Sequence, residues 1–365
     1  MKNLKINKKI IFINVIIFAF FLLSPPTALW GYRISKNLIA KFRGRSTDPR
    51  ANADQFKDKN FSHQLFREKE SLEMEYKSYI GWRPKVVNLK FTNIEKPYNT
   101  RSSILQNLSK STWFFGGSTI WGIGSSDKGT IPSLYSRKSN SPVFNFGEQS
   151  WQSRQSLNQL ISALGDGHQP KVIIFYDGVN DLATGCKSEF KEIPVHSRQR
   201  IFSTSIKNKS AIINSNKIIK FLLEPYSGVQ RKLSKQRFPE NWNYDCTTDI
   251  KKANSVASHL VNNWYSAYVI SKVNKARFFA ILQPYNPNHI SQEKELYQKM
   301  YPLIKNLIKQ KCLSDKEFCS TFVDGSNWIN PNSNYFIDSC HLIEEGNGVV
   351  ADKIINLTNK YGENY

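Results

Sequence analysis

The sequence predicts an α/β fold in which helices cover both faces of a parallel sheet. From Ser111 onward, short apolar strands alternate with helical stretches, the pattern of successive βαβ units. The stretch from Ser111 to Gly124, STWFFGGSTIWGIG, runs from β-branched and aromatic residues into paired glycines, which indicates a strand and a tight turn. Open α/β sheets place their chemistry at such carboxyl ends of strands. By itself, Ser118 in this turn also suits an ordinary turn residue or helix cap.

The expected elements follow from apolar runs of 3–6 residues and from longer helical patterns between them. The expected strands are Thr112–Phe115, Pro142–Phe146, Val172–Tyr176, Phe278–Gln283 and Thr321–Val323. The expected helices are Pro132–Ser139, Ser153–Leu164, Asn254–Lys275, Glu293–Lys311 and a last one from Val349 towards Leu357. Thr130 and Pro132 mark the start of the first helix, because proline is tolerated in a first turn.

Length and composition indicate a globular protein with a sizeable core. The chain has 365 residues, 40% of them hydrophobic and 13% aromatic, unlike a disordered segment. A formal net charge of +22 would suit anionic partners. The lysines are scattered along the chain, however, so a solvated basic surface is the favoured interpretation. With no recognisable nucleic-acid motif, no nucleic-acid partner is expected.

The amino terminus is expected to be a membrane anchor, within a first segment 1–32. Four lysines in Met1–Lys9 precede the apolar run Ile10–Leu23, and extension to Trp30 gives roughly the 20 residues of a spanning helix. The catalytic part would then lie outside the cytoplasm, periplasmic or extracellular. A cleavable signal peptide, with secretion, is the alternative. The lack of a small-x-small cleavage site after Leu23 favours the uncleaved anchor.

Two further segments are expected around the α/β domain, which should span 108–360. Residues 33–107 are polar, basic and weakly patterned, typical of a linker with a few helices. The interval of about 185–249 breaks the strand-helix rhythm and is interpreted as an insertion. Either a substrate flap or a packed surface subdomain would explain its aromatic residues, which include Phe221, Tyr226, Phe238, Trp242 and Tyr244.

The five cysteines suit an oxidising compartment. Cys186 and Cys246 flank the insertion, Cys312 and Cys319 would close a small loop, and Cys340 is left over. Both pairings are plausible disulfides, although sequence does not prove connectivity. None of the cysteines has the CxxC spacing of a zinc site, so no metal is expected.

Four groups of polar residues and glycines follow predicted strands or come after the last one. They are Gly116-Gly117-Ser118, Asn145-Phe146-Gly147, Gly178-Val179-Asn180-Asp181 and Asp338-Ser339-Cys340-His341. Each motif alone is common, but all four in this order are hard to obtain by chance.

These residue types supply what nucleophilic catalysis needs. A serine hydroxyl, here Ser118, needs a neighbouring imidazole to take its proton. The imidazole of His341 needs a carboxylate on its other nitrogen, and Asp338 lies three residues before it. The backbone amides of Ser118 and Gly147 and the side-chain amide of Asn180 are the expected oxyanion donors.

In these residues the chain resembles the SGNH (GDSL-like) hydrolases. Their four signature residues match Ser118, Gly147, Asn180 and His341, with Asp338 as the acid. Gln283-Pro284, after the fourth strand, is also similar to the family. The resemblance covers roughly residues 111–360 and implies a flavodoxin-like α/β/α sandwich with five parallel strands. It also implies ester hydrolysis through an acyl-enzyme, without a cofactor.

One departure from the family is Gly117, where the usual motif has an aspartate. That aspartate is not the acid of the triad, so catalysis need not be lost, but the orientation of the nucleophile turn becomes less certain.

Other enzyme motifs fit less well. Ile120 stands where G-x-S-x-G needs its second glycine, and Ser125–Lys128 satisfies S-x-x-K without its companion motifs. The chain has no Walker A, dinucleotide or HExxH motif. The remaining histidines lack an aspartate three residues before them and receive no role. They are His63, His168, His196, His259 and His289.

The sequence therefore predicts a membrane-anchored serine esterase acting on a glycan, lipid or small acyl ester. An acyltransferase that uses the same residues and excludes water is the nearest alternative. A non-catalytic glycan-binding scaffold is a second alternative, although such a module would not need the intact set of four polar side chains.

Overall fold

The computed structural model describes residues 14, 44–203, 243–289 and 291–360. Contacts divide the chain into two units, one of residues 1–45 with 200–241 and one of residues 46–199 with 242–365. The second unit carries the sheet and the predicted site, and it is described below. The predicted anchor and four of the five insertion aromatics lie outside the described residues, all but Tyr244.

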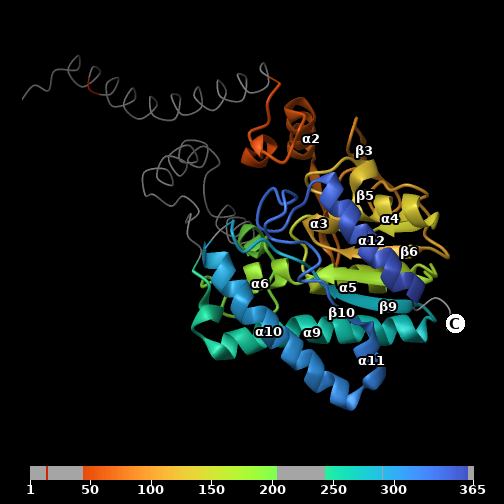
Figure 1. The fold of residues 1–365 in the computed structure, drawn as a ribbon, viewed down its shortest axis with the longest axis vertical. Helices are drawn as coiled ribbons and strands as arrows, with labels where there is room; N and C mark the ends of the chain where they lie inside the picture. Colours follow the sequence, from red (N-terminus) through yellow and green to blue (C-terminus); the bar gives the residue numbers. More distant parts are fainter. Residues whose placement is uncertain (1–13, 15–43, 204–242, 290, 361–365) are drawn as a thin grey trace, which may run out of the picture. The chain divides into compact units, whose positions relative to one another are not determined.

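A five-stranded parallel sheet forms the centre of this unit, as predicted (Figure 1). Its strands are β6 (Thr112–Gly116), β7 (Val143–Asn145), β8 (Val172–Asp177), β9 (Arg277–Leu282) and β10 (Phe322–Asp324). Their order across the sheet is β10-β9-β8-β6-β7, which is the flavodoxin-like order. The chain reverses direction across the sheet between β6 and β8, so their carboxyl ends form the switch point where such folds bind ligands.

Alternating side chains of the strands build one core on each face of the sheet. Trp113 and Phe115 of β6 belong to one buried cluster, and Phe114 belongs to the other. On the first face lie α5 (Ser153–Gly165), α6 (Val179–Gly185), α9 (Ile250–Val273), α10 (Ser291–Ser314) and α11 (Lys316–Thr321). On the second lie α4 (Ile131–Ser139) and α12 (Glu344–Lys360). The result is the three-layer sandwich that the resemblance implied.

Local signals place the helix starts. The Thr130 side chain caps α4, and proline stands in its first turn, as the sequence predicted. Asp249 caps α9 by accepting hydrogen bonds from the amides of Lys251 and Lys252. That helix begins at Ile250, four residues before its predicted start, because the cap lies at the end of the insertion rather than within the apolar pattern.

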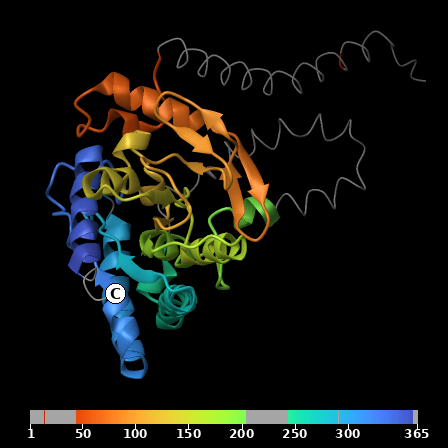
Figure 2. The ribbon, with the colours of Figure 1, turned by 90° about the vertical axis from the view of Figure 1, so that its right-hand side faces the viewer.

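The described part of 33–107 holds one α-helix and short strands, whereas the sequence predicted a linker with a few helices. Residues 46–107 hold a 3₁₀ turn, η1 (Pro49–Asn52), one α-helix, α2 (Lys59–Ser71), and short strands in two antiparallel sheets. The strands are β1 (Met74–Lys77), β2 (Gly81–Pro84), β3 (Val87–Asn88), β4 (Asn93–Glu95) and β5 (Thr100–Arg101). Strands this short carry too few residues for an alternating pattern to stand out. Figure 2 shows this orange segment along the outside of the yellow elements that follow it.

Two disulfides confirm the predicted pairings. Cys186 is bonded to Cys246 and Cys312 to Cys319, each pair with Cα atoms 5.2 Å apart, while Cys340 is free and buried. The first bond joins the two ends of the insertion. Tyr244, beside that bond, packs into the core, so this one aromatic residue is structural rather than part of a flap.

Within the described ranges, no helix is both long and apolar enough to cross a membrane.

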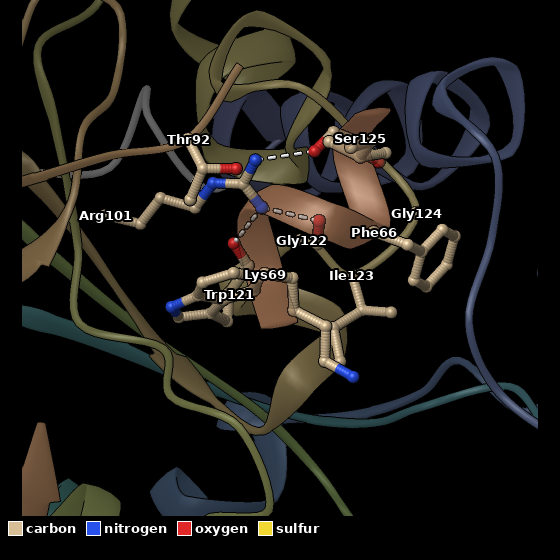
Figure 3. A pocket seen from close by; sticks show the side chains of 10 residues that line it. Phe66, Lys69, Thr92, Arg101, Trp121, Gly122, Ile123, Gly124 and Ser125 are labelled. Carbon is tan, nitrogen blue, oxygen red and sulfur yellow. Dashed lines mark hydrogen bonds between the residues drawn. The ribbon is translucent and has the colours of Figure 1, made fainter. Parts of the chain in front are cut away.

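A buried arginine ties residues 46–107 to the element that carries Ser118. Arg101 donates to the carbonyls of Trp121 (3.1 Å), Gly122 (2.6 Å) and Ser125 (2.5 Å), as Figure 3 shows. Its Nε lies 2.8 Å from Asp127 Oδ1. These carbonyls lie at the end of α3 (Ser118–Trp121), a single turn of helix, and just after it. The Gly122 carbonyl also accepts the Ser125 amide at 3.2 Å, so the guanidinium reinforces a turn that the backbone has begun to bond.

Arg101→Met should therefore lower the free energy of unfolding by about 3–5 kcal/mol, the usual cost of removing one partner of a buried ionic network. Urea unfolding measures the change. Arg67→Met is the matched control because Arg67 is exposed on α2, and it should change stability by less than about 0.5 kcal/mol. Equal stability of the two variants would contradict the bracing role of Arg101.

Candidate active site

The turn after β6 needs glycine because the backbone of β8 lies against it. Gly116 has φ 156°, and a Cβ atom there would lie 2.5 Å from the Tyr176 carbonyl oxygen. Ser118 is the first residue of α3, where the backbone amide has no acceptor within its own helix. The residue is 7% exposed, so it is largely shielded from solvent.

Ser118, His341 and Asp338 form a hydrogen-bonded relay. Ser118 Oγ lies 2.7 Å from His341 Nε2, and His341 Nδ1 lies 2.6 Å from Asp338 Oδ2. The serine and the histidine are 223 residues apart in the chain, and the structure brings them together as predicted. In this geometry the imidazole can accept the serine proton on one nitrogen while the carboxylate holds the other.

Four donors converge on the Asp338 carboxylate. Oδ1 accepts the backbone amides of Cys340 (3.0 Å) and His341 (2.8 Å). Oδ2 faces His341 Nδ1 and also accepts Nη1 of Arg50 at 3.1 Å. Burial would raise the pKa of Asp338, but His341, Arg50 and the Cys340 amide together hold that pKa well below its usual range. The carboxylate therefore stays ionised and fixed beside the imidazole.

Asn180 lies beside the nucleophile turn. It follows Gly178, which has φ 126° and precedes α6. Asn180 Nδ2 donates to the Trp151 carbonyl at 2.8 Å, and a Cβ atom on Gly117 would lie only 2.2 Å from that nitrogen. The amide of Asn180 thus occupies the space that a side chain at position 117 would need.

The backbone amide of Gly147 bonds within the protein rather than facing the nucleophile Ser118. Its amide donates to Asn145 Oδ1 at 3.0 Å, and Asn145 Nδ2 donates to the Ile120 carbonyl at 3.0 Å. A Cβ atom on Gly147 would lie 2.6 Å from the amide nitrogen of Trp121. Close packing against α3 therefore explains this glycine, and its N–H already has an internal acceptor. Of the three predicted oxyanion donors, this one is not directed to the nucleophile.

A second buried arginine supports the Gly147 loop. Arg83 donates to the carbonyls of Phe146 (2.9 Å) and Gly147 (3.0 Å), and it lies 3.5 Å from the Glu148 carboxylate. Burial lowers the pKa of Arg83 to about 10 and raises that of Glu148 to about 7. The sequence analysis missed this pair, as it missed Arg50, because neither arginine lies in a motif.

Two more buried carboxyls lie near Asn180. Asp181 accepts the Ser153 hydroxyl at 2.6 Å, and Asp177 accepts the indole N–H of Trp264 at 3.3 Å. Burial raises the pKa of Asp181 to about 6 and that of Asp177 well above its usual value. Asp181, the last residue of the predicted Gly178–Asp181 motif, thus anchors α6 to α5 rather than facing the nucleophile Ser118.

One group of possible metal-binding side chains occurs among the described residues. Donor atoms of Asp338, Cys340 and His341 lie within 4.8 Å of one another. The guanidinium of Arg50 already neutralises this carboxylate. Burial also raises the pKa of the Cys340 thiol, which opposes the thiolate form that binds metals. The group therefore fits a cation poorly, and no metal is assigned to it.

A family model identifies the protein family to which this chain belongs. Residues 113–354, more than half of the chain, match the family model of GDSL-like lipases and acylhydrolases. The chain belongs to this family. Membership makes it a serine hydrolase that acts on ester bonds. Ser118, Asn180 and His341 all lie within the matched range.

Solved structures of low sequence identity resemble this chain, and no curated protein matches it. A putative acylhydrolase from Bacteroides fragilis is 16% identical, with 69% of this chain and 88% of that chain covered and a TM-score of 0.38. A carbohydrate acetylesterase family member from Sinorhizobium meliloti is 15% identical, with coverage of 68% and 98% and a TM-score of 0.34. An acetyl xylan esterase is 13% identical, with coverage of 67% and 98% and a TM-score of 0.38.

Gly117→Ala should lower kcat for a p-nitrophenyl ester by about 10²–10³-fold, the usual effect of losing one oxyanion donor. The added methyl would displace the Asn180 amide, which lies 2.2 Å from its position. Steady-state kinetics give the change. Gly165→Ala is the control, because a Cβ atom at Gly165 has no neighbour within 4 Å. Unchanged kcat in a folded Gly117→Ala protein would show that Asn180 is not needed where it lies.

Proposed function

We propose that this chain is a membrane-anchored esterase that works through an acyl-enzyme on Ser118. The observation that carries the proposal is the relay of two short contacts, 2.7 Å from Ser118 Oγ to His341 Nε2 and 2.6 Å from His341 Nδ1 to Asp338 Oδ2. Membership of the family supports ester hydrolysis. The roles of individual residues rest on this geometry.

In the first half-reaction, Ser118 Oγ attacks the acyl carbon and its proton passes to His341 Nε2. The negative charge that develops on the carbonyl oxygen is stabilised by the Ser118 amide and by Asn180 Nδ2. That nitrogen carries a second hydrogen besides the one donated to Trp151. Gly147 would contribute only if its amide released Asn145.

As the tetrahedral intermediate collapses, the bond to the alcohol breaks and His341 returns the proton to the leaving oxygen. Water then attacks the ester of Ser118, with His341 as general base, and releases the acid. Asp338 keeps the imidazole oriented and stabilises its positive form in both halves. Every bond and proton in the two half-reactions is accounted for by Ser118, His341, the ester and water, so neither half-reaction needs a cofactor.

The proposed substrate is an acylated glycan or lipid, with an O-acetyl group as the simplest acyl part. The expected anchor would hold the enzyme near such polymers and lipids, and the net charge of +22 would favour anionic ones. The two related structures whose names refer to carbohydrate and xylan acetyl esters suggest which acyl group to test first.

Ser118→Ala should abolish labelling by a fluorophosphonate probe and lower turnover of p-nitrophenyl acetate by at least about 10³-fold. Full-length protein in detergent is the material. Ser125→Ala, in which a buried serine close in sequence is removed, should still be labelled. Equal turnover by the parent and Ser118→Ala would refute the assignment. A glycan acceptor in the same assay separates hydrolysis from acyl transfer by its product.

An alkaline phosphatase fused after Tyr365 should be active in intact bacterial cells, because the proposed topology exports everything that follows the anchor. The two disulfides agree with an oxidising compartment. A fusion without the first 32 residues is the control and should be inactive. Activity of a cytoplasmic reporter at the same position, with an inactive phosphatase, would refute export.

A further inference from the structure

Arg50 reaches the triad from an element far away in the sequence. It lies in η1, 288 residues before Asp338. Its Nη1 lies 3.1 Å from Asp338 Oδ2 and 3.4 Å from His341 Nδ1. The same carboxylate oxygen therefore faces both the guanidinium and the imidazole. Nothing in the motifs of the family region, which begins at residue 113, provides this contact.

The guanidinium is held from behind by its own set of contacts. Asp48 accepts Nε at 2.9 Å and Nη2 at 2.7 Å, and Lys69 Nζ lies 2.9 Å from the same carboxylate. The ring of Phe66 lies 5.4 Å from Arg50 Cζ, within cation–π range. Such two-point binding fixes a guanidinium in a plane, which a lysine could not reproduce.

We propose that Arg50 is a positioning residue of the catalytic triad, which sets the orientation of Asp338 beside His341. The inference rests on the proposed function of Ser118 and His341. The guanidinium occupies one lone-pair direction of Oδ2, so the carboxylate keeps the other for the imidazole.

The other charged and titratable groups near the relay do not replace this effect. Cys340 Sγ lies 3.6 Å from His341 Nδ1, and burial keeps the pKa of that thiol well above its usual value, so the thiol stays neutral. Glu293 adds a carboxyl that interacts with Asp338. Lys69 bonds Asp48 rather than the triad. Arg50 is thus the cation in direct contact with Asp338 among the described side chains.

Arg50→Gln should lower kcat for p-nitrophenyl acetate about three- to tenfold and leave KM unchanged, the effect expected when Asp338 loses one hydrogen bond that orients it. Arg50→Lys keeps the charge but not the two-point contact with Asp48, so it should restore only part of kcat. Arg67→Gln, the same change at an exposed position of α2, should leave both constants unchanged.

A second readout does not depend on turnover. The low-field proton NMR signal of His341 Nδ1–H, assigned by its loss in His341→Gln, reports the contact with Asp338 Oδ2 directly. It should broaden in Arg50→Gln, because a carboxylate that is no longer held in place leaves this proton open to exchange with water, and it should match the parent in Arg67→Gln. A folded Arg50→Gln protein with the parental signal overturns the positioning role, whatever its activity. An inactive parent whose signal still broadens in Arg50→Gln would instead refute the proposed esterase and leave the positioning role standing.

Discussion

The site depends on three arginines that residues 46–107 direct into the α/β domain. Arg50 bonds the triad carboxylate, Arg83 bonds the carbonyls after β7, and Arg101 bonds the carbonyls after α3. Burying a guanidinium is costly unless each of its hydrogens finds an acceptor. Loop carbonyls supply acceptors to Arg83 and Arg101, and carboxylates supply them to Arg50. Nε of Arg83 is buried without an acceptor among the described residues. Residues 46–107 and the catalytic loops therefore stabilise one another.

The nucleophile turn is confined from the remaining sides by close backbone contacts. At Gly116, Gly117 and Gly147 a Cβ atom would lie 2.2–2.6 Å from the nearest atom. The neighbours are the backbone of β8, the Asn180 amide and the end of α3. An added side chain would therefore displace the Asn180 amide at Gly117 and backbone at the other two positions, so these glycines help to fix Ser118 relative to His341. Preorganisation of this kind is what makes fixed donors effective at a developing oxyanion.

The sheet and the catalytic relay could be predicted from the sequence because both have local signatures. Strand positions follow from apolar runs, and Ser118, Asp338 and His341 stand in recognisable motifs directly after strands or on one loop. The structure of residues 46–107 could not be predicted in the same way. Its strands have two to four residues, and a buried arginine such as Arg83 looks like a surface residue in a basic sequence. What makes it special is the set of carbonyls it meets, and these come together only in the fold. The hydrogen bond from the Gly147 amide to Asn145 Oδ1 could not be predicted for the same reason. A motif identifies the glycine, but it does not show which group accepts its N–H.

Burial alone would drive the carboxyls of this region towards the neutral form, yet Asp338 resists. Asp177, Asp181 and Glu148 have raised pKa values, with burial as the main cause. Asp338 is also buried, but two backbone amides, the imidazole and a guanidinium converge on it, and its pKa is lowered. Asp181 also accepts several hydrogen bonds, all from neutral donors of Ser153 and the backbone. Asp338 combines two backbone amides with the close charged partners His341 and Arg50, and this combination keeps it ionised despite its burial. One of those partners, Arg50, comes from residues 46–107, which lie outside the family's matched region.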